Sequence, residues 1–256
     1  MLKKLILTLL MGASASLAIA AETPSPAAEA TVRAAVLKLA PGLQIDQIGP
    51  APLAGFYQVI ASGQLVYVSS DGKYMLNGSL VDLAAKKDLA DTAWAGFRKA
   101  ELAKVPVAQR IVYAPANPLH TVTVFSDVTC GYCKELHKHI ADLNKAGIAV
   151  QYLAWPREGV TDEAGRDTAT YTEMVSVWCA SDRNKAFDDA MNGRAPKPAT
   201  CANPVRDQFK LGVRLGVSGT PSVMAEDGTM IGGYLSPEQM RTKLDQLSAK
   251  PAGKTG

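Results

Sequence analysis

The chain has 256 residues, of which 47% are hydrophobic, 6% aromatic and 20% charged, and it contains four cysteines. This composition is that of a globular protein, and it excludes a collagenous chain, a coiled-coil rod and a wholly disordered protein. Four cysteines in so long a chain are too few for a small disulfide-stabilised scaffold. At about 100–200 residues per domain, the length allows one large domain or two small ones.

The first twenty residues have the features of a secretory signal peptide. Lys3 and Lys4 form a basic start, an apolar run follows, and Ala18-Ile19-Ala20 offers a small-x-small cleavage site. A retained membrane anchor is the alternative, but spanning takes about 20 largely apolar residues, and glycine and serines interrupt this run. We therefore expect cleavage after Ala20, export to a compartment where disulfides persist, and no membrane insertion of the mature chain.

The charge of the mature chain argues against a nucleic-acid partner. The whole chain has a formal net charge of +3, and removing the two lysines of the signal peptide lowers it to +1. The sequence has no basic block and no basic stripe interleaved with aromatic residues, which a nucleic-acid surface would need.

Residues 21–85 are expected to form a small α+β domain. After a frayed start over residues 21–30, a helix is predicted over 31–39. Strand-like runs follow in the order 43–48, 56–61, 65–69 and 74–77. Asp71-Gly72 is a hairpin turn signal between the last two runs. Because this region is too small to bury a large core alone, we expect it to dimerise.

Residues 86–108 are predicted to form a linker helix that ends near Pro106 and is capped at its start by Asp91 or Thr92. Only three residues in its later half are large and apolar, namely Trp94, Phe97 and Leu102. This pattern favours a weakly amphipathic helix between domains over a core helix.

Residues 109–256 have the alternating pattern of an α/β domain. Strands are predicted over 120–126 and from residue 148, and a helix over 130–146 connects them, which implies a parallel pair with a crossover. Further helices are expected over 161–191, with a break near Ser181-Asp182, and over 204–215.

The end of the chain is predicted to be a hairpin followed by a helix. Asp227-Gly228 supplies the turn between strands at 222–225 and 229–232. Ser236-Pro237-Glu238-Gln239 is a capping box with proline at the first helical position, and it predicts where the final helix starts.

Cys130-Gly131-Tyr132-Cys133 lies where a predicted strand ends and a helix begins. At a helix N-terminus, unpaired N–H groups and the helix dipole stabilise a thiolate, so Cys130 is the expected nucleophile. Cys133 follows one helical turn later, within reach for a disulfide with Cys130. The pair can therefore accept a disulfide from a substrate or donate one to it.

Three other uses of this pair fit the sequence less well. A c-type haem site needs histidine directly after the second cysteine, where this chain has Lys134. A structural zinc site needs a second closely spaced ligand pair, and Cys179 and Cys201 are far apart; we expect no metal and no other cofactor. A purely structural disulfide would be poorly placed at a helix start to brace the fold.

Cys179 and Cys201 flank a polar stretch that has little apolar content to hold it. This favours a structural disulfide, which on the chain-entropy model would contribute roughly 3–4 kcal/mol by closing a loop of about 23 residues. A second redox-active pair is the alternative.

Gly219-Thr220-Pro221-Ser222 follows a predicted helix and precedes a predicted strand, where a cis proline could pack against a dithiol from another part of the chain. Only about 5% of X–Pro bonds are cis. From the local sequence alone, an ordinary trans proline at the start of a strand is therefore favoured.

Residues 122–133 resemble the active-site segment of the periplasmic disulfide isomerases of the DsbC/DsbG family, and residues 216–221 resemble the cis-proline loop of that family. The likeness covers nearly the whole mature chain, including residues 49–55, residues 184–189 and the two outer cysteines. DsbG is less similar, since it lacks the outer disulfide and has proline after its first active cysteine.

The resemblance implies a periplasmic homodimer in which the N-terminal units dimerise, the linker helices act as hinges and two thioredoxin-like domains face a shared cleft. It implies a cis bond at Pro221, with Thr220 presenting backbone groups to an extended substrate. Gly131 and Tyr132 would be the active-site dipeptide. The implied substrates are misfolded disulfide-containing proteins, and a DsbD-type membrane reductase would reset the dithiol.

The prediction is thus a two-domain α+β protein: a signal peptide (1–20), a dimerisation domain (21–85), a linker helix (86–108) and a thioredoxin-like α/β catalytic domain with a helical insertion (109–256). Its predicted function is that of a disulfide isomerase or reductase. A dithiol oxidase and a dimeric holdase chaperone without essential redox chemistry remain alternatives.

Many thioredoxins have a buried acid six residues before the first cysteine, where this chain has Val124. Asp127 is as well suited to capping the helix as to proton transfer, so it is left out of the catalytic set.

Overall fold

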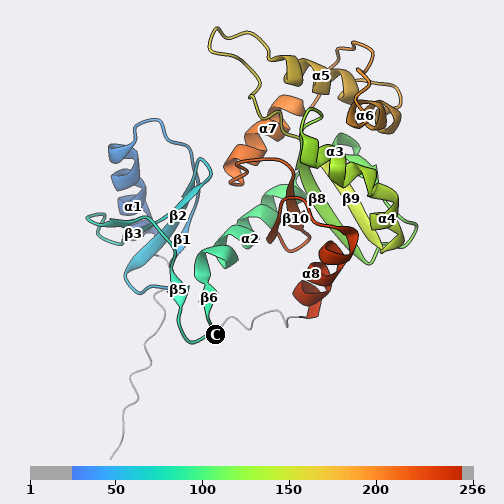
Figure 1. Cartoon of the computed structure of the whole chain (residues 1–256). Helices are drawn as coiled ribbons and strands as arrows, with labels where there is room; N and C mark the ends of the chain where they lie inside the picture. The colour runs from blue at the N-terminus through green and yellow to red at the C-terminus, as the bar shows by residue number, and fades with distance from the viewer. Residues whose placement is uncertain (1–24, 250–256) are drawn as a thin grey trace, which may run out of the picture.

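The computed structural model describes residues 25–249, which form two regions joined by a long helix (Figure 1). The predicted signal peptide lies outside the described residues. The predicted α+β class is confirmed, because one antiparallel four-stranded sheet lies before the long helix and a mixed five-stranded sheet with helices lies after it. Within residues 25–249, no helix is both long and apolar enough to cross a bilayer.

The N-terminal region is a helix packed on a sheet. Helix α1 (Pro26–Leu39) precedes four strands in chain order: β1 (Ile45–Pro50), β2 (Phe56–Ala61), β3 (Gln64–Ser69) and β4 (Met75–Leu76). The helix buries Val32 and Val36 against Val59 of β2 and Val68 of β3. This small core of β-branched side chains holds the region together.

Helix α1 begins at Pro26, earlier than the predicted start at residue 31. Proline is pre-organised for the first turn of a helix, where its missing N–H costs no hydrogen bond. Residues 26–30, which were predicted to be frayed, are therefore helical. The predicted hairpin turn at Asp71-Gly72 is present, with Gly72 in the left-handed region at φ +71°.

The joining helix α2 (Leu89–Ala103) is capped by Asp88, whose carboxylate accepts a hydrogen bond from the N–H of Ala90. The prediction that Asp91 or Thr92 caps this helix was wrong, because a pair of two-residue strands precedes the helix and moves its start. The pair is β5 (Val81–Asp82) and β6 (Lys87–Asp88), and it brings Asp88 to the capping position.

Helix α2 contributes to the protein core, which differs from the expected weakly amphipathic linker. Its residues Phe97 and Leu102 are buried together with Ile60 of β2 and Leu215, which follows α7 (Val205–Arg214). Arg98 is also buried and donates from Nε to the carbonyl oxygen of Leu215 at 3.0 Å. The helix therefore lies between the two regions and packs against both (Figure 1).

The two regions also meet in a charged contact. The carboxylate of Asp46 in β1, whose side chain is fully buried, pairs with Arg214 at the end of α7. Arg214 also contacts Glu101 of α2 at 3.1 Å, so one guanidinium joins all three parts of the chain.

The C-terminal region is built on a five-stranded sheet with the strand order β11-β10-β8-β9-β7. In chain order its strands are β7 (Ile111–Tyr113), β8 (His120–Ser126), β9 (Ile148–Ala154), β10 (Ser222–Ala225) and β11 (Met230–Gly232). Strands β8 and β9 are parallel, as the strand–helix–strand order predicted, and the other neighbours pair antiparallel.

The predicted helix over 130–146 is divided into α3 (Gly131–Lys138) and α4 (Ile140–Lys145). The N–H of His139 bonds to the carbonyl oxygen of Leu136, only three residues earlier, and this tighter turn separates the two helices. Leu136 and Leu143 are both buried in spite of the break.

Residues 161–168 are a loop, and the predicted helical stretch over 161–191 begins only with α5 (Ala169–Trp178) and continues in α6 (Arg183–Met191). The carboxylate of Asp162 accepts hydrogen bonds from the backbone N–H groups of Ala164 and Arg166, and such a local turn competes with helix formation.

The final helix, α8 (Pro237–Ala249), begins at the predicted capping box, in which Ser236 and Gln239 exchange hydrogen bonds.

The two faces of the sheet pack against different helices. Val124 of β8 and Tyr152 of β9 point to the face covered by α3, α5, α6 and α8. Phe125 and Leu153 point to the opposite face, where α2 and α7 lie. The motif at residues 130–133 therefore lies over the first face, at the C-terminal end of β8.

Candidate active site

The sheet and α3 place the two cysteines of the motif in a buried position. Cys130 is the N-cap of α3, and Cys133 lies in the first turn of the helix. Both are free thiols, with exposed fractions of 3% and 1%. Between them, Gly131 starts the helix and the Tyr132 side chain points outward, with 68% of the residue exposed.

Asp127 organises the turn that connects β8 to α3. One of its carboxylate oxygens accepts the backbone N–H and the hydroxyl of Thr129, both at 2.7 Å. The other accepts the backbone N–H of Arg157 at 2.8 Å and lies 3.3 Å from its Nε. With four donors directed at it, this fully buried carboxylate holds the turn and the Arg157 guanidinium in place beside the dithiol.

The loop at residues 219–221 lies against Cys130. Strand β10 pairs with β8 so that Ser222 is opposite Phe125, which brings the preceding residues to the start of α3. The Thr220–Pro221 peptide bond is cis, and the thiol of Cys130 donates to the carbonyl oxygen of Thr220 at 3.2 Å. The structure thus brings together the two motifs that are ninety positions apart in the sequence.

The two thiols have opposite acidities. Burial would raise the pKa of Cys130, but hydrogen bonds from Thr220 and Cys133 and the positive charge of Arg157 outweigh it, so the pKa is lowered. Burial dominates at Cys133 and raises its pKa to about 12, although Ser126 and Asp127 partly oppose this. At neutral pH, Cys130 is the thiol that can act as a nucleophile.

The hydroxyl groups of Ser126 and Thr220 act on the two thiols of the motif. Ser126 Oγ and Thr220 Oγ1 are buried, and neither makes a hydrogen bond to a nitrogen or oxygen atom within residues 25–249. The Ser126 hydroxyl lowers the pKa of Cys133, and that of Thr220 lowers the pKa of both thiols. Both hydroxyls can therefore donate to negative charge on sulfur during exchange.

Two family models match the chain. Residues 23–91 match the disulfide bond isomerase protein N-terminal domain, and residues 107–248 match a thioredoxin-like domain. The thiol:disulfide interchange protein DsbC of Escherichia coli (strain K12) is 39% identical over 83% of this chain and 86% of its own length. That of Salmonella typhimurium is 38% identical over 88% of this chain and 91% of its own length.

The chain belongs to the DsbC family. It is therefore a thiol:disulfide oxidoreductase whose C-terminal region is a thioredoxin-like domain.

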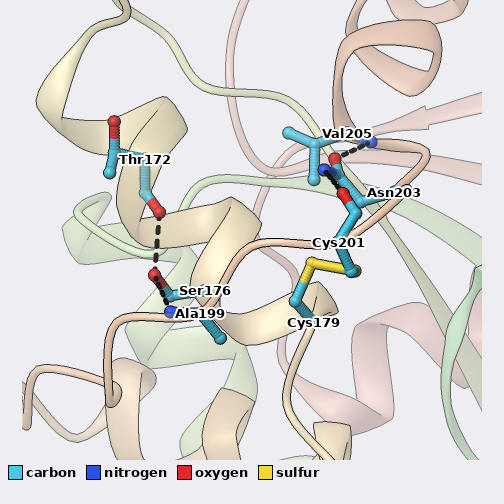
Figure 2. Close-up of a disulfide and its surroundings, with 7 residues drawn as sticks. All are labelled: Thr172, Ser176, Cys179, Ala199, Cys201, Asn203 and Val205. Atoms are coloured by element: carbon cyan, nitrogen blue, oxygen red, sulfur yellow. Dashed lines mark hydrogen bonds between the residues drawn. A yellow bond between two sulfur atoms is a disulfide. The ribbon is translucent and has the colours of Figure 1, made fainter.

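The second cysteine pair of this DsbC-family chain is a disulfide between Cys179 and Cys201 (Figure 2). Cys179 ends α5, and Cys201 lies in the segment that leads to α7. Next to it, the hydroxyl of Ser176 accepts the N–H of Ala199 at 3.3 Å, and the amide of Asn203 donates to the carbonyl oxygen of Cys201 at 2.9 Å. The disulfide thus fastens a long loop to the end of α5.

Two residues of the DsbC-family site, Ser126 and Arg157, were not predicted from the sequence. Ser126 is the last residue of a strand and has no motif of its own, although an alternating strand that ends next to a motif places its last side chain close by. Arg157 lies thirty positions after Asp127, and only the parallel pairing of β8 with β9 brings it near.

Among the described residues, no cluster of three His, Cys, Asp or Glu side chains could hold a metal ion.

Proposed function

We propose that this chain is a periplasmic disulfide isomerase that acts on misfolded proteins through Cys130 and Cys133. The observation that carries this proposal is the asymmetry of the dithiol. Cys130 has a lowered pKa and lies against Thr220, whereas Cys133 is deeper and holds its proton. Such a pair separates attack on a substrate from release of that substrate.

In the first step, the Cys130 thiolate attacks a wrong disulfide. A bond forms between its sulfur and one substrate sulfur, the substrate S–S bond breaks, and the other substrate sulfur leaves as a thiolate. The hydroxyl of Thr220 and the charge of Arg157 stabilise the attacking sulfur while it is negative.

Two outcomes follow from the mixed disulfide. A second substrate thiolate can attack the substrate sulfur, which forms a new substrate disulfide and regenerates the Cys130 thiolate with no net redox change. Otherwise Cys133 attacks Cys130, the substrate leaves with its thiol reduced, and the two enzyme cysteines are left as a disulfide. In that case a DsbD-type membrane reductase returns the two electrons.

The substrate is expected to bind beside the dithiol. Tyr132 is exposed next to the reactive sulfur, and Gly131 leaves the helix start open, since no atom lies within 4 Å of the place a Cβ would take. Thr220 and Pro221 form the loop facing Cys130, and we assign them the role of holding an extended substrate segment through backbone groups.

The chain is proposed to work as a homodimer through residues 21–85, with residues 86–108 as linker and 109–256 as catalytic domain. Strand β4 lies at the edge of the N-terminal sheet and is only two residues long. Exposed apolar side chains gather in this region, as a surface covered by a partner would show. They are Leu37, Leu39, Leu53, Tyr74, Met75, Leu76, Val81 and Leu83.

A cleaved signal peptide over residues 1–20 would deliver the chain to the periplasm, where the Cys179–Cys201 disulfide is stable. We assign that disulfide a structural role and the Cys130–Cys133 pair the catalytic one.

The experiment that tests this function compares wild-type protein with a Cys130→Ala variant on a substrate protein containing scrambled disulfides. We expect the variant to lose reactivation down to the uncatalysed rate, because the other described free thiol, Cys133, is buried and has a pKa raised to about 12. A Cys179→Ala/Cys201→Ala variant, assayed where it is folded, is the matched control and keeps reactivation.

Persisting reactivation by Cys130→Ala would contradict the proposal, and aggregation suppression without reactivation by the wild type would indicate a holdase instead. The redox state of freshly isolated protein separates the remaining alternative. An isomerase has Cys130 and Cys133 largely reduced, whereas a dithiol oxidase has them joined.

A further inference from the structure

Arg157 is fixed beside the turn that carries the nucleophilic sulfur. Its backbone N–H donates to one carboxylate oxygen of Asp127 at 2.8 Å, and its Nε lies 3.3 Å from the same oxygen. Its Nη2 lies 3.4 Å from the hydroxyl of Thr129, the residue directly before Cys130. The backbone N–H of Cys130 in turn bonds to the carbonyl oxygen of Asp127 at 3.1 Å. These contacts hold the guanidinium next to Cys130 while the substrate arrives.

Most of the donors of this guanidinium are free. An arginine side chain carries five N–H donors in a planar fork. The contacts with Asp127 and Thr129 use one donor on Nε and one on Nη2, and the side chain makes no other hydrogen bond within residues 25–249. Because 46% of the side chain is exposed, the remaining donors on Nη1 and Nη2 are available to a group that a substrate brings.

The acidic residues nearest to Arg157 in the chain and in space are occupied elsewhere. Asp127 has a fully buried side chain, so a substrate cannot reach its charge. Glu158 accepts a hydrogen bond from the hydroxyl of Thr170 in α5 at 3.3 Å. Arg157 forms no ion pair besides that with Asp127 in the described part of the chain. A substrate that approaches Cys130 therefore meets the cation of this pair and not its anion.

A carboxylate is the group that suits these free donors best. Its two oxygens can accept parallel hydrogen bonds from the planar guanidinium, which makes the contact stronger and more directional than one with a neutral group. Consecutive Cα atoms of a chain are about 3.8 Å apart. Since Arg157 contacts the neighbour of Cys130, an acidic side chain that neighbours the substrate cysteine is within its reach during the attack.

We propose that Arg157 is a specificity-determining residue, which makes the protein attack fastest those substrate disulfides that have an acidic side chain next to the cysteine. The substrate carboxylate binds the free donors of Arg157 and so holds the S–S bond at Cys130. The exchange of sulfur partners itself is the one described above and gains no further step. The inference deepens the proposed function and rests on it, because it names the class of substrate that the same site prefers.

The test is a competition between two peptides for Cys130. Each peptide contains one disulfide, and the two are identical except that glutamate flanks the cysteines in one and glutamine in the other. Equal amounts react with reduced Cys133→Ser protein, acid stops the reaction at low conversion, and mass spectrometry measures the two mixed disulfides at Cys130. Because both peptides meet the same thiolate, the ratio of the products does not depend on the pKa of Cys130.

Arg157→Gln, introduced into the Cys133→Ser protein, should lower the ratio of glutamate product to glutamine product by about threefold, which is the size expected for an exposed ion pair. Raising the salt from about 0.05 M to about 1 M should lower the ratio in the protein that keeps Arg157, since salt screens exposed charges. The same change of salt should lower it less in Arg157→Gln.

Two matched variants control for the loss of one positive charge. Arg33→Gln removes an arginine whose side chain is also 46% exposed and paired with a carboxylate, but which lies in α1 of the N-terminal region. Lys134→Gln removes a cation one helical turn after Cys130, where the side chain lines a pocket of 530 Å³ beside α3 and α6. Both variants should keep the product ratio of the protein that has Arg157.

An unchanged ratio in folded Arg157→Gln protein would overturn the inference, and so would an equal fall of the ratio in Lys134→Gln, since the preference would then come from the general field around α3. If Arg157→Gln does not fold, the salt dependence decides, and a ratio that stays constant up to about 1 M salt would overturn the inference. Failure of both peptides to form a mixed disulfide at Cys130 would instead contradict the proposed function.

Discussion

The two cysteine pairs of the catalytic region have opposite surroundings. Cys179 and Cys201 are joined and connect the end of α5 to a polar loop. Cys130 and Cys133 remain thiols at the start of a helix, where buried hydroxyls, a backbone carbonyl oxygen and Arg157 act on them unequally. Burial alone therefore does not make a cysteine unreactive here, since donors around the Cys130 sulfur outweigh its burial, whereas at Cys133 burial dominates.

The two cysteine pairs should differ most in how much each contributes to the free energy of unfolding of the protein. Replacing both outer cysteines by alanine should lower the free energy of unfolding by about 3–4 kcal/mol, because the unfolded chain gains the freedom of the open loop. Chemical denaturation of the double variant measures this. The rate at which Cys130 reacts with a small disulfide should stay within about twofold of wild type at temperatures where the variant is folded.

A double variant that keeps wild-type stability but loses the reactivity of Cys130 would contradict this division between the two pairs. It would mean that the Cys179–Cys201 disulfide takes part in the exchange itself.

A smaller effect concerns the pH dependence of the stability of the reduced protein. Cys133 has a raised pKa, so between its ordinary value of 9.0 and about 12 the unfolded chain releases a proton that the folded chain keeps. Stability therefore falls as pH rises through this range, by about 1.4 kcal/mol per pH unit. Cys130 has a lowered pKa, so its contribution rises with pH below 9.0 and then stays constant.

Denaturation midpoints at pH 8 and pH 10 measure this effect, with Cys133→Ala as the comparison. The wild type should lose about 1.4 kcal/mol more than the variant between these values. An equal loss in both proteins would show that Cys133 ionises as easily as an ordinary thiol. The thiolate absorbance of the Cys130→Ala and Cys133→Ala variants across the same range supplies an independent check.

The sequence predicted those parts of the fold and site that depend on neighbours along the chain. The strand before Cys130, the parallel pairing of β8 with β9 and the capping box at Ser236 all follow from local patterns. The loop at residues 161–168 was predicted as helix, because periodicity does not reveal that Asp162 turns back on the chain.

The parts that escaped prediction depend on contacts between distant segments. The placement of Arg157 beside Asp127 depends on the sheet, and the burial of Arg98 depends on the carbonyl group of Leu215. His137 and Asp188 lie on different helices and meet only in the packed core. No local signal in the sequence distinguishes such residues from ordinary surface residues of a helix.

The central claim is that Cys130 alone receives the substrate. Its most direct test is to incubate Cys133→Ser protein with a scrambled substrate and to locate the trapped mixed disulfide by peptide mass mapping. We expect substrate attached to Cys130, with Cys179 and Cys201 still joined to each other. Substrate found on Cys179 or Cys201 in comparable amount, or none on Cys130, would contradict it.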